Sequence, residues 1–153
     1  MKEAIFQAKK ARSIDEVPVG AVLVRHGKIL AAGHNSTISR KDPTAHAEVV
    51  VLRKAAKIIG NHRISKAHLY VTLEPCSMCA GAIVNARIEN LIFGAFDYRS
   101  GAVGSAFDLL NNKRTNHKVN IIGGVQQEEC LQILKGFFEE RRSSDKKTKR
   151  TFC

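Results

Sequence analysis

The stretch AHLYVTLEPCSMCAGAIVNA, residues 67–86, decides the fold. Residues 67–73 form a β-rich run that Pro75 ends, because proline cannot continue a hydrogen-bonded ladder. Residues 76–86 have the small and aliphatic side chains of a buried helix. A strand that leads directly into a helix indicates an α/β unit, and the connection between them carries two cysteines.

The segments on either side predict further strands and helices in alternation. Apolar periodicity and turn residues predict helices at 2–12, from Ala45 to Gly60, at 106–112 and at about 126–142. Further strands are predicted at 19–25, 28–34, 90–96 and 119–125, and a glycine-rich loop at 97–105. The first two strands form a hairpin through His26 and Gly27. We therefore predict an α/β fold, a three-layer α/β/α sandwich with a mixed five-stranded sheet whose strand C-termini hold the site.

The composition indicates one folded domain. The chain has 153 residues, of which 44% are apolar, and a chain of this size buries about 70% of its unfolded surface. We expect this domain at residues 1–142 and a basic C-terminal tail at 143–153. The sequence predicts no membrane helix and no signal peptide, and four cysteines with one CxxC fit a reducing compartment. We therefore expect a cytoplasmic protein with no membrane partner.

The charge of the chain indicates an anionic partner, with nucleic acid as the leading class. The formal net charge is +11, and residues 141–150 contain six Lys or Arg and one Asp. The rest of the chain is also basic, so the tail is not the only source of the charge. A solvated, frayed end is the alternative interpretation of the tail itself.

Two motifs together predict a zinc site. TAHAE at 44–48 and EPCSMC at 74–79 supply one imidazole, one carboxylate and two thiols, and we expect His46, Cys76 and Cys79 to bind one Zn²⁺. Cys76 and Cys79 are three residues apart at a helix start, so that both thiols lie on one face and the helix N-terminus favours their thiolates. His46 and Glu48 are two residues apart, so they can converge only at a helix end.

Three protein ligands leave a fourth position for water, whose pKa zinc lowers to about 7. Glu48 is not needed as a ligand, and it can move protons from that water to a ring nitrogen and to departing ammonia. H-x-E followed by P-C-x-x-C is the known signature of the zinc nucleobase deaminases. The CxxC alone would equally suit a redox pair or half of a structural zinc site.

A structural site needs a fourth ligand, for which four histidines are nominal candidates, but none of them has the paired spacing of such sites. We expect these four histidines at the surface or in turns: His34, His62, His68 and His117. Cys130 is expected in the core and Cys153 as a free terminal thiol.

A longer set of motifs narrows the resemblance to one family of these deaminases. VPVGAVLV, GHN, TAHAE, LYVTLEPCSMCAGAI, ARI, FGAFDYRSGAVGS and FFEERR, spread over residues 1 to about 142, resemble the bacterial tRNA adenosine deaminase (TadA) family of the cytidine/deoxycytidylate deaminase superfamily. The resemblance implies a cytidine deaminase-like fold and deamination of adenosine to inosine at the wobble position, A34, of an arginine tRNA. It also implies a homodimer with one zinc ion per subunit as the only cofactor.

The resemblance also implies roles for individual residues. Glu48 would be the proton shuttle, Asn35 would read the flipped purine, and the N–H groups of Ala47 and Cys76 would face the developing oxygen. Asp97 would accept a hydrogen bond from a ribose hydroxyl. The base pocket would be walled by Val17, Pro18 and Leu73, and the anticodon stem-loop would contact Arg99, Phe137, Phe138, Arg141 and Arg142.

Several of these residues have a simpler interpretation. Asn35 and Asp97 are also typical turn or cap residues, the three pocket residues could be ordinary core, and one of the two phenylalanines is expected to be buried. The family often has Lys where Arg99 stands, which keeps the charge but not the contact geometry.

Two other functions stay open at this point. One is a deaminase of a free base or nucleotide, such as guanine or cytidine, although a small substrate gives no reason for the basic surface. The other is an RNA-binding module with structural zinc, which leaves Glu48 and the fourth coordination position unexplained.

Overall fold

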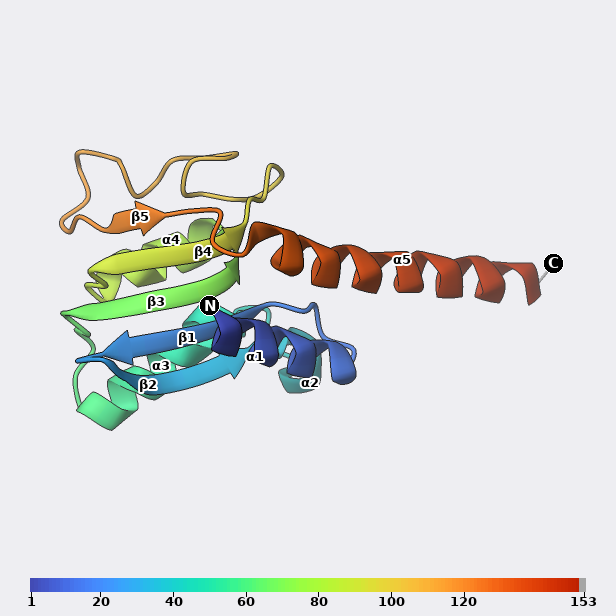
Figure 1. Ribbon diagram of the computed structural model, residues 1–153, viewed down its shortest axis with the longest axis horizontal. Coiled ribbons are helices and arrows are strands. Elements are labelled where there is room, and N and C mark those ends of the chain that lie inside the picture. The colour runs from blue at the N-terminus through green and yellow to red at the C-terminus, as the bar shows by residue number, and fades with distance from the viewer. Residues whose placement is uncertain (152–153) are drawn as a thin grey trace.

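The computed structural model describes the backbone of residues 1–151 and the side chains of residues 1–144. Figure 1 shows the elements in order. They are α1 (Lys2–Ser13), β1 (Gly20–Arg25), β2 (Lys28–His34), α2 (Thr37–Arg40), α3 (Ala47–Ile59), β3 (Ala67–Leu73), α4 (Ser77–Asn85), β4 (Asn90–Ala95), β5 (Asn120–Ile122) and α5 (Gln127–Thr151).

The five strands form one mixed sheet in the order β2-β1-β3-β4-β5. β1 pairs antiparallel with both β2 and β3, whereas β3, β4 and β5 run parallel. β2, β3 and β4 therefore end at the same edge of the sheet. The prediction of a mixed five-stranded sheet is confirmed, and segments distant in sequence meet at this edge.

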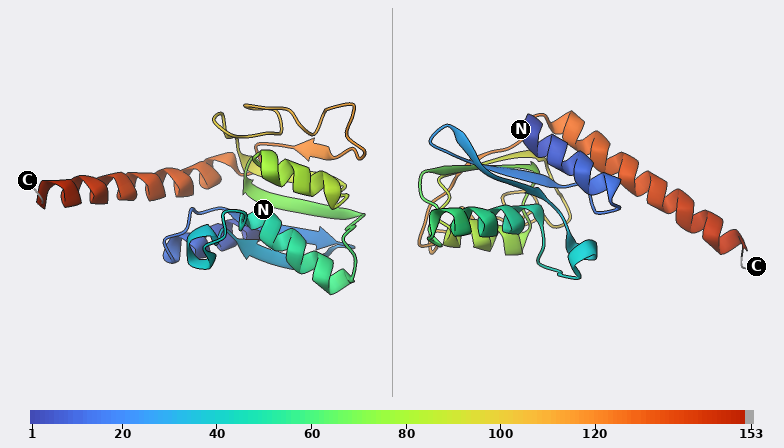
Figure 2. Two further views of the ribbon diagram at one scale, coloured as in Figure 1. Left: turned by 180° about the vertical axis from the view of Figure 1, so that it is seen from behind. Right: turned by 90° about the horizontal axis from the view of Figure 1, so that it is seen from below.

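Helices cover both faces of the sheet, as predicted. α1 and α5 lie side by side on one face, and α3 and α4 lie on the other (Figure 2). Gly20 and Gly94 allow the close approach on the first face. A Cβ at Gly20 would stand 2.0 Å from the Ala4 carbonyl oxygen of α1, and one at Gly94 would stand 2.4 Å from Cys130 Sγ of α5.

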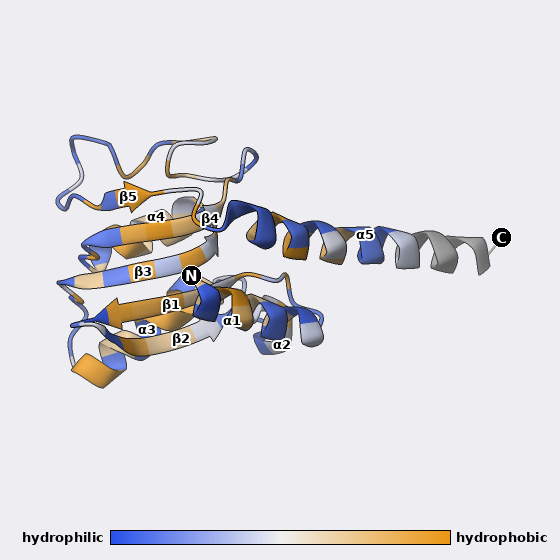
Figure 3. Cartoon of the chain, viewed as in Figure 1, coloured by the Kyte–Doolittle hydropathy of each residue, from blue (hydrophilic) through white to orange (hydrophobic). Residues whose placement is uncertain are grey.

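The hydropathy of the elements follows this arrangement. The strands are mostly hydrophobic and much of α5 is hydrophilic (Figure 3). Strand residues Leu23, Leu69 and Leu91 are fully buried between the two helical layers. In the part of the chain that the structure describes, no helix combines the length and the apolar character needed to cross a membrane.

The predicted helix at 106–112 is wrong. This segment folds back on the preceding loop, so its backbone bonds there instead of along a helix: Phe107 N–H donates to the Gly101 carbonyl and Leu109 N–H to the Ala102 carbonyl. The Asp108 carboxylate then accepts a hydrogen bond from Asn111 N–H and ends the segment in a turn.

Two further elements differ from the prediction in length. The last strand stops at Ile122, because Gly123 and Gly124 follow and Gly124 has a left-handed φ of 81°. The last helix, expected to end near Arg142, continues to Thr151, since neither Gly nor Pro occurs after Gly136 to stop it. In Figure 1 this helix extends well beyond the sheet.

Candidate active site

His46, Cys76 and Cys79 converge at the common edge of the sheet. His46 is the N-cap of α3, Cys76 is the N-cap of α4, and Cys79 lies in the first turn of α4. His46 Nδ1 lies 3.6 Å from the Sγ atoms of both cysteines. Tetrahedral zinc with a Zn–N distance of about 2.0 Å and a Zn–S distance of about 2.3 Å needs a separation of roughly 3.5 Å. Among the described residues, these three form the one His, Cys, Asp or Glu cluster with metal-binding spacing.

The pKa values of these three groups are shifted in different directions. Hydrogen bonds from Cys79 and His46 lower the pKa of Cys76 to about 4. The same bond with Cys76, together with burial, raises the pKa of the Cys79 thiol. The hydrogen bond with Cys76 also raises the pKa of His46. A divalent cation requires deprotonated ligands, so metal binding here would release protons.

Glu48 is placed beside this cluster by the first turn of α3. Its side chain is buried, with 4% of its surface exposed. Burial raises the pKa of this carboxyl, because it disfavours the charged form. A buried carboxyl next to a metal-ligand set is a candidate for proton transfer.

Asn35 follows the end of β2 and holds the start of α3. Its Oδ1 accepts a hydrogen bond of 2.8 Å from Ala47 N–H, and its own N–H donates to the Val19 carbonyl. The Ala47 N–H group is therefore engaged, whereas no hydrogen bond links the Cys76 N–H to the described part of the chain. Asn35 thus acts as a cap, as its simpler interpretation suggested, and its Nδ2 keeps its protons for another partner.

A family model of the MafB19-like deaminases matches residues 1–142. The tRNA-specific adenosine deaminases of Haemophilus influenzae and Bacillus subtilis are each 49% identical to the chain, over 95% of it and over 85% and 91% of their own lengths. The chain belongs to this deaminase family. A solved structure from a study of tRNA:A34 deaminases has a TM-score of 0.85 at 43% identity, covering 88% of this chain and 97% of that one.

Where β3 and β4 end, the deaminase fold forms a cavity of about 560 Å³. Five residues predicted to contact the substrate line it together: Val17, Leu73, Asp97, Arg99 and Phe138. Pro18 is not in this lining and is fully buried. Leu73, the last residue of β3, lines the cavity and precedes Cys76 by three positions, whereas none of the three clustered residues is in the lining.

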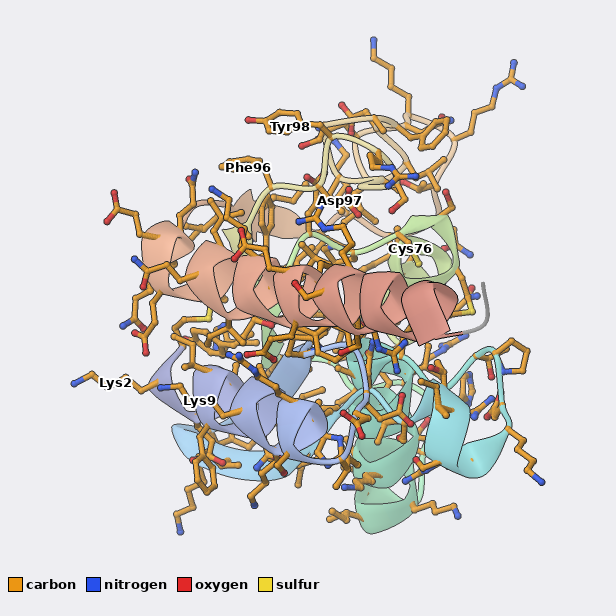
Figure 4. All side chains as sticks on the ribbon, turned by 90° about the vertical axis from the view of Figure 1, so that its right-hand side faces the viewer. Lys2, Lys9, Cys76, Phe96, Asp97 and Tyr98 are labelled. Carbon is orange, nitrogen blue, oxygen red and sulfur yellow. The ribbon has the colours of Figure 1, made fainter. Side chains whose placement is uncertain are left out.

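Phe96 and Tyr98 also line this cavity, and the sequence analysis did not single them out. In the view of Figure 4, Asp97 lies between Cys76 and this aromatic pair. The only signal in the sequence was two aromatic residues on either side of an aspartate. That signal could not show that both rings face the same cavity.

Asp97 organises the loop that carries these rings. Its Oδ1 accepts hydrogen bonds from the N–H groups of Arg99 and Ser100, and its Oδ2 accepts one of 2.5 Å from Ser100 Oγ. Burial raises the pKa of this carboxyl, but these hydrogen bonds outweigh it and hold the pKa below the usual value. The side chain therefore holds the turn, and Asp97 is at the same time one of the residues that line the cavity.

Glu74 is a second functional residue that the sequence analysis missed. This buried carboxylate accepts hydrogen bonds from the N–H groups of Asp97, Val103 and Ser105, at 3.0 to 3.1 Å, and from Ser105 Oγ. It thereby ties the loop after β4 to the residue pair that precedes Cys76. The signal was present in the motif EPCSMC, but its partners are distant in sequence.

The residues predicted on the last helix have different surroundings. Phe137 is buried and packs edge-on against Phe138 at 5.4 Å, whereas Phe138 is 46% exposed. Arg141 lies over the Phe137 ring, with 5.1 Å between its guanidinium carbon and the ring centre, and it donates to the Asp15 carbonyl. Arg142 is exposed.

The other histidines and cysteines lie away from the cluster. His34, His68 and His117 bond to Asn35, Asn90 and Ile88, and His62 is exposed. Cys130 is buried against β4, which raises its pKa to about 11. Cys153 lies outside the described residues.

Proposed function

We propose that this protein is a zinc-dependent hydrolase that deaminates adenosine to inosine at A34, the wobble position, of a tRNA anticodon. The observation that carries the proposal is the buried Glu48 beside the convergent His46, Cys76 and Cys79. Relatives covering nearly the whole chain are tRNA-specific adenosine deaminases, which supports adenosine as the substrate.

Glu48 performs the proton transfers of this reaction. When bound by the three ligands, zinc supplies Lewis-acid chemistry that makes hydroxide available near neutral pH. The oxygen adds to C6 of adenine, and ammonia leaves as the C6 carbonyl of inosine forms. Glu48 takes one proton from the attacking water and delivers it to N1. It then takes the proton of the hydroxyl group at C6 and passes it to the departing amino nitrogen, so that ammonia leaves as the carbonyl forms. Its burial keeps bulk water from competing for these protons.

Asn35 and Cys76 orient the base. Because Asn35 Oδ1 is engaged by Ala47, the amide contributes its Nδ2 protons, which suit an acceptor nitrogen of a purine. The Cys76 N–H is the better placed of the two backbone donors for the oxygen at C6, since the Ala47 N–H already has a partner. Val17 and Leu73 form the apolar wall of the pocket, and the fully buried Pro18 packs behind it.

Residues of the loop after β4 and of α5 hold the anticodon stem-loop. Asp97 Oδ2 accepts a hydrogen bond from a ribose 2′-hydroxyl, which distinguishes RNA from DNA. Cations and stacking surfaces come from Arg99, Phe137, Phe138, Arg141 and Arg142, with Phe137 acting by supporting Phe138 and Arg141. Residues 143–153 extend beyond the deaminase domain at 1–142 and add charge for phosphates.

The protein acts on arginine tRNA in the cytoplasm as a homodimer with one zinc ion per subunit. The outer side of α3 and α4 supports self-association, because it carries an apolar cavity of about 330 Å³ lined by residues that include Val49, Leu52 and Ala82. Sedimentation equilibrium of the zinc-loaded protein tests the dimer directly.

The activity is tested with purified, zinc-loaded protein and four substrates: an arginine tRNA with A34, free adenosine, guanine and cytidine. Nuclease digestion and mass spectrometry then detect inosine, xanthine or uridine. We expect inosine from the tRNA alone, and the same tRNA with G34 is the matched control. Conversion of guanine or cytidine without conversion of the tRNA would overturn the assignment.

A variant separates proton transfer from metal binding. Glu48→Gln keeps the shape of the side chain but cannot shuttle a proton, so turnover should fall by at least about a hundredfold. Zinc content, measured by atomic emission, should stay at one ion per subunit. Loss of zinc in this variant would show that Glu48 holds the metal site together.

A further inference from the structure

We propose that Phe96 and Tyr98 form a stacking platform for an unpaired nucleobase next to the reacting adenosine in the tRNA loop. This inference rests on the proposed function and names a second base-binding subsite of the same enzyme. The platform consists of these two rings only.

The two rings are arranged as a stack with an anchored inner member. Phe96 and Tyr98 are nearly parallel, with an interplanar angle of 20° and 6.4 Å between ring centres. Phe96 is fixed from below by Phe93, which meets it edge-on at 5.0 Å and 86°. Tyr98 is 80% exposed, so most of its surface is open to a ligand.

The surroundings of the platform suit a nucleobase. Both rings line the cavity of about 560 Å³ together with Phe138 and Arg99. An isolated exposed aromatic residue needs no explanation, but here three rings and a guanidinium share one cavity. Unpaired RNA bases stack on such aromatic and guanidinium faces, and the net charge of +11 favours an anionic polymer over an apolar protein segment.

The loop holds the platform in place before any ligand binds. The Asp97 carboxylate accepts hydrogen bonds from the N–H groups of Arg99 and Ser100. These bonds fix the turn at residues 97–100, which carries Tyr98 and follows Phe96. The Asp97 N–H donates to the buried Glu74. A preformed surface loses little entropy on binding, so stacking contributes to affinity.

The position of the platform identifies the base it takes. The reacting adenine must reach Cys76 and Glu48, and both rings share one cavity with Leu73, which we expect to wall the pocket of that adenine. A base that flanks A34 therefore lies at the platform while A34 occupies the pocket. Stacking tolerates any base, so the platform selects an unpaired conformation and not a sequence.

Steady-state kinetics on an anticodon stem-loop test the proposal. Tyr98→Ala should raise KM about tenfold with little change in kcat, because one stacked base is lost. Tyr98→Phe should behave like the wild type. Phe107→Ala is the matched control, since Phe107 is an exposed aromatic residue of the same loop outside the cavity lining.

A stem-loop that lacks the base at position 33 or at position 35 then locates the contact. Removing the stacked base should cost the wild type about tenfold and the Tyr98→Ala variant nothing further. If the Tyr98→Ala loss persists equally on both abasic substrates, or if Tyr98→Ala has no effect, the platform is refuted.

A direct binding signal is available because the chain contains no tryptophan. Tyr98→Trp in the Glu48→Gln background gives a single indole, whose fluorescence a stacked base should quench. Absence of quenching at saturating stem-loop would contradict stacking. Failure of the wild type to deaminate the stem-loop at all would instead refute the proposed function, and with it the subsite.

Discussion

Glu74 offers a quantitative test of how the active-site loop is held. Its carboxylate is 2% exposed and accepts three backbone N–H groups and one hydroxyl from the loop after β4. Glu74→Ala removes all four acceptor contacts at once. Glu74→Gln keeps the shape and one oxygen but turns an NH₂ group toward one pair of donors.

The expected losses follow from the hydrogen bonds. A hydrogen bond to a charged group contributes about 1.5–3 kcal/mol, and a buried N–H left without a partner costs about 1–3 kcal/mol. Water can enter a loop at the sheet edge and satisfy some of the freed donors, so we expect Glu74→Ala to lower the free energy of unfolding by about 3–5 kcal/mol. Glu74→Gln should cost about 1–3 kcal/mol, because only one pair of contacts is disturbed.

Urea unfolding of the zinc-loaded variants measures the two free energies, and amide hydrogen exchange locates the change. Protection should fall at Asp97, Val103 and Ser105 in Glu74→Ala. Glu16→Ala is the control, because Glu16 is a fully buried carboxylate that accepts hydrogen bonds from Ser39 in α2 instead. Equal losses for the Ala and Gln variants, or unchanged protection of the three amides, would refute the hydrogen-bond argument.

Three further predictions concern the same loop, the metal and the tail. Gly101→Ala should lower the free energy of unfolding by about 1–3 kcal/mol and raise KM for tRNA, because its Cβ would stand 2.5 Å from the Asp97 carbonyl oxygen. Gly81→Ala is the control and should leave stability unchanged, because a Cβ there meets nothing within 4 Å. Urea unfolding measures both free energies. Chelation of zinc should lower the unfolding temperature of the wild type but not that of an already metal-free Cys79→Ser variant, as calorimetry would show. Deleting residues 143–153 should reduce the slope of log Kd for tRNA against log salt by about 0.7–0.9 per lost phosphate contact, and an unchanged slope would exclude a phosphate-binding role.

The strands and the long helices could be predicted because each satisfies its own periodicity. α2 could not, since Thr37–Arg40 is too short for a period to show, and it depends on Glu16, which accepts a hydrogen bond from Thr37 Oγ1. The segment 106–112 has helical composition, but its backbone finds partners in Gly101 and Ala102. In both cases a hydrogen bond to a residue outside the segment decides the local structure.

The convergence of His46, Cys76 and Cys79 could be predicted for a similar reason, because all three lie at two helix starts. The hydrogen bond between Asn35 and Ala47 could not be predicted in this way. These two residues come close together only when the sheet has folded. The stacking of Phe96 on Tyr98 likewise depends on a turn held by Asp97 and Glu74. Sequence spacing therefore predicts the reacting centre better than it predicts the surface around it.

Glu74 joins these two parts of the site. It stands between Leu73, which lines the cavity, and Pro75, which precedes Cys76 of the candidate metal site. Its carboxylate at the same time holds Asp97, and through Asp97 the rings of Phe96 and Tyr98. One residue thus contacts the loop that carries the two rings and also belongs to the segment that leads into Cys76. The glutamate of the EPCSMC motif therefore ties the cavity loop to the start of α4.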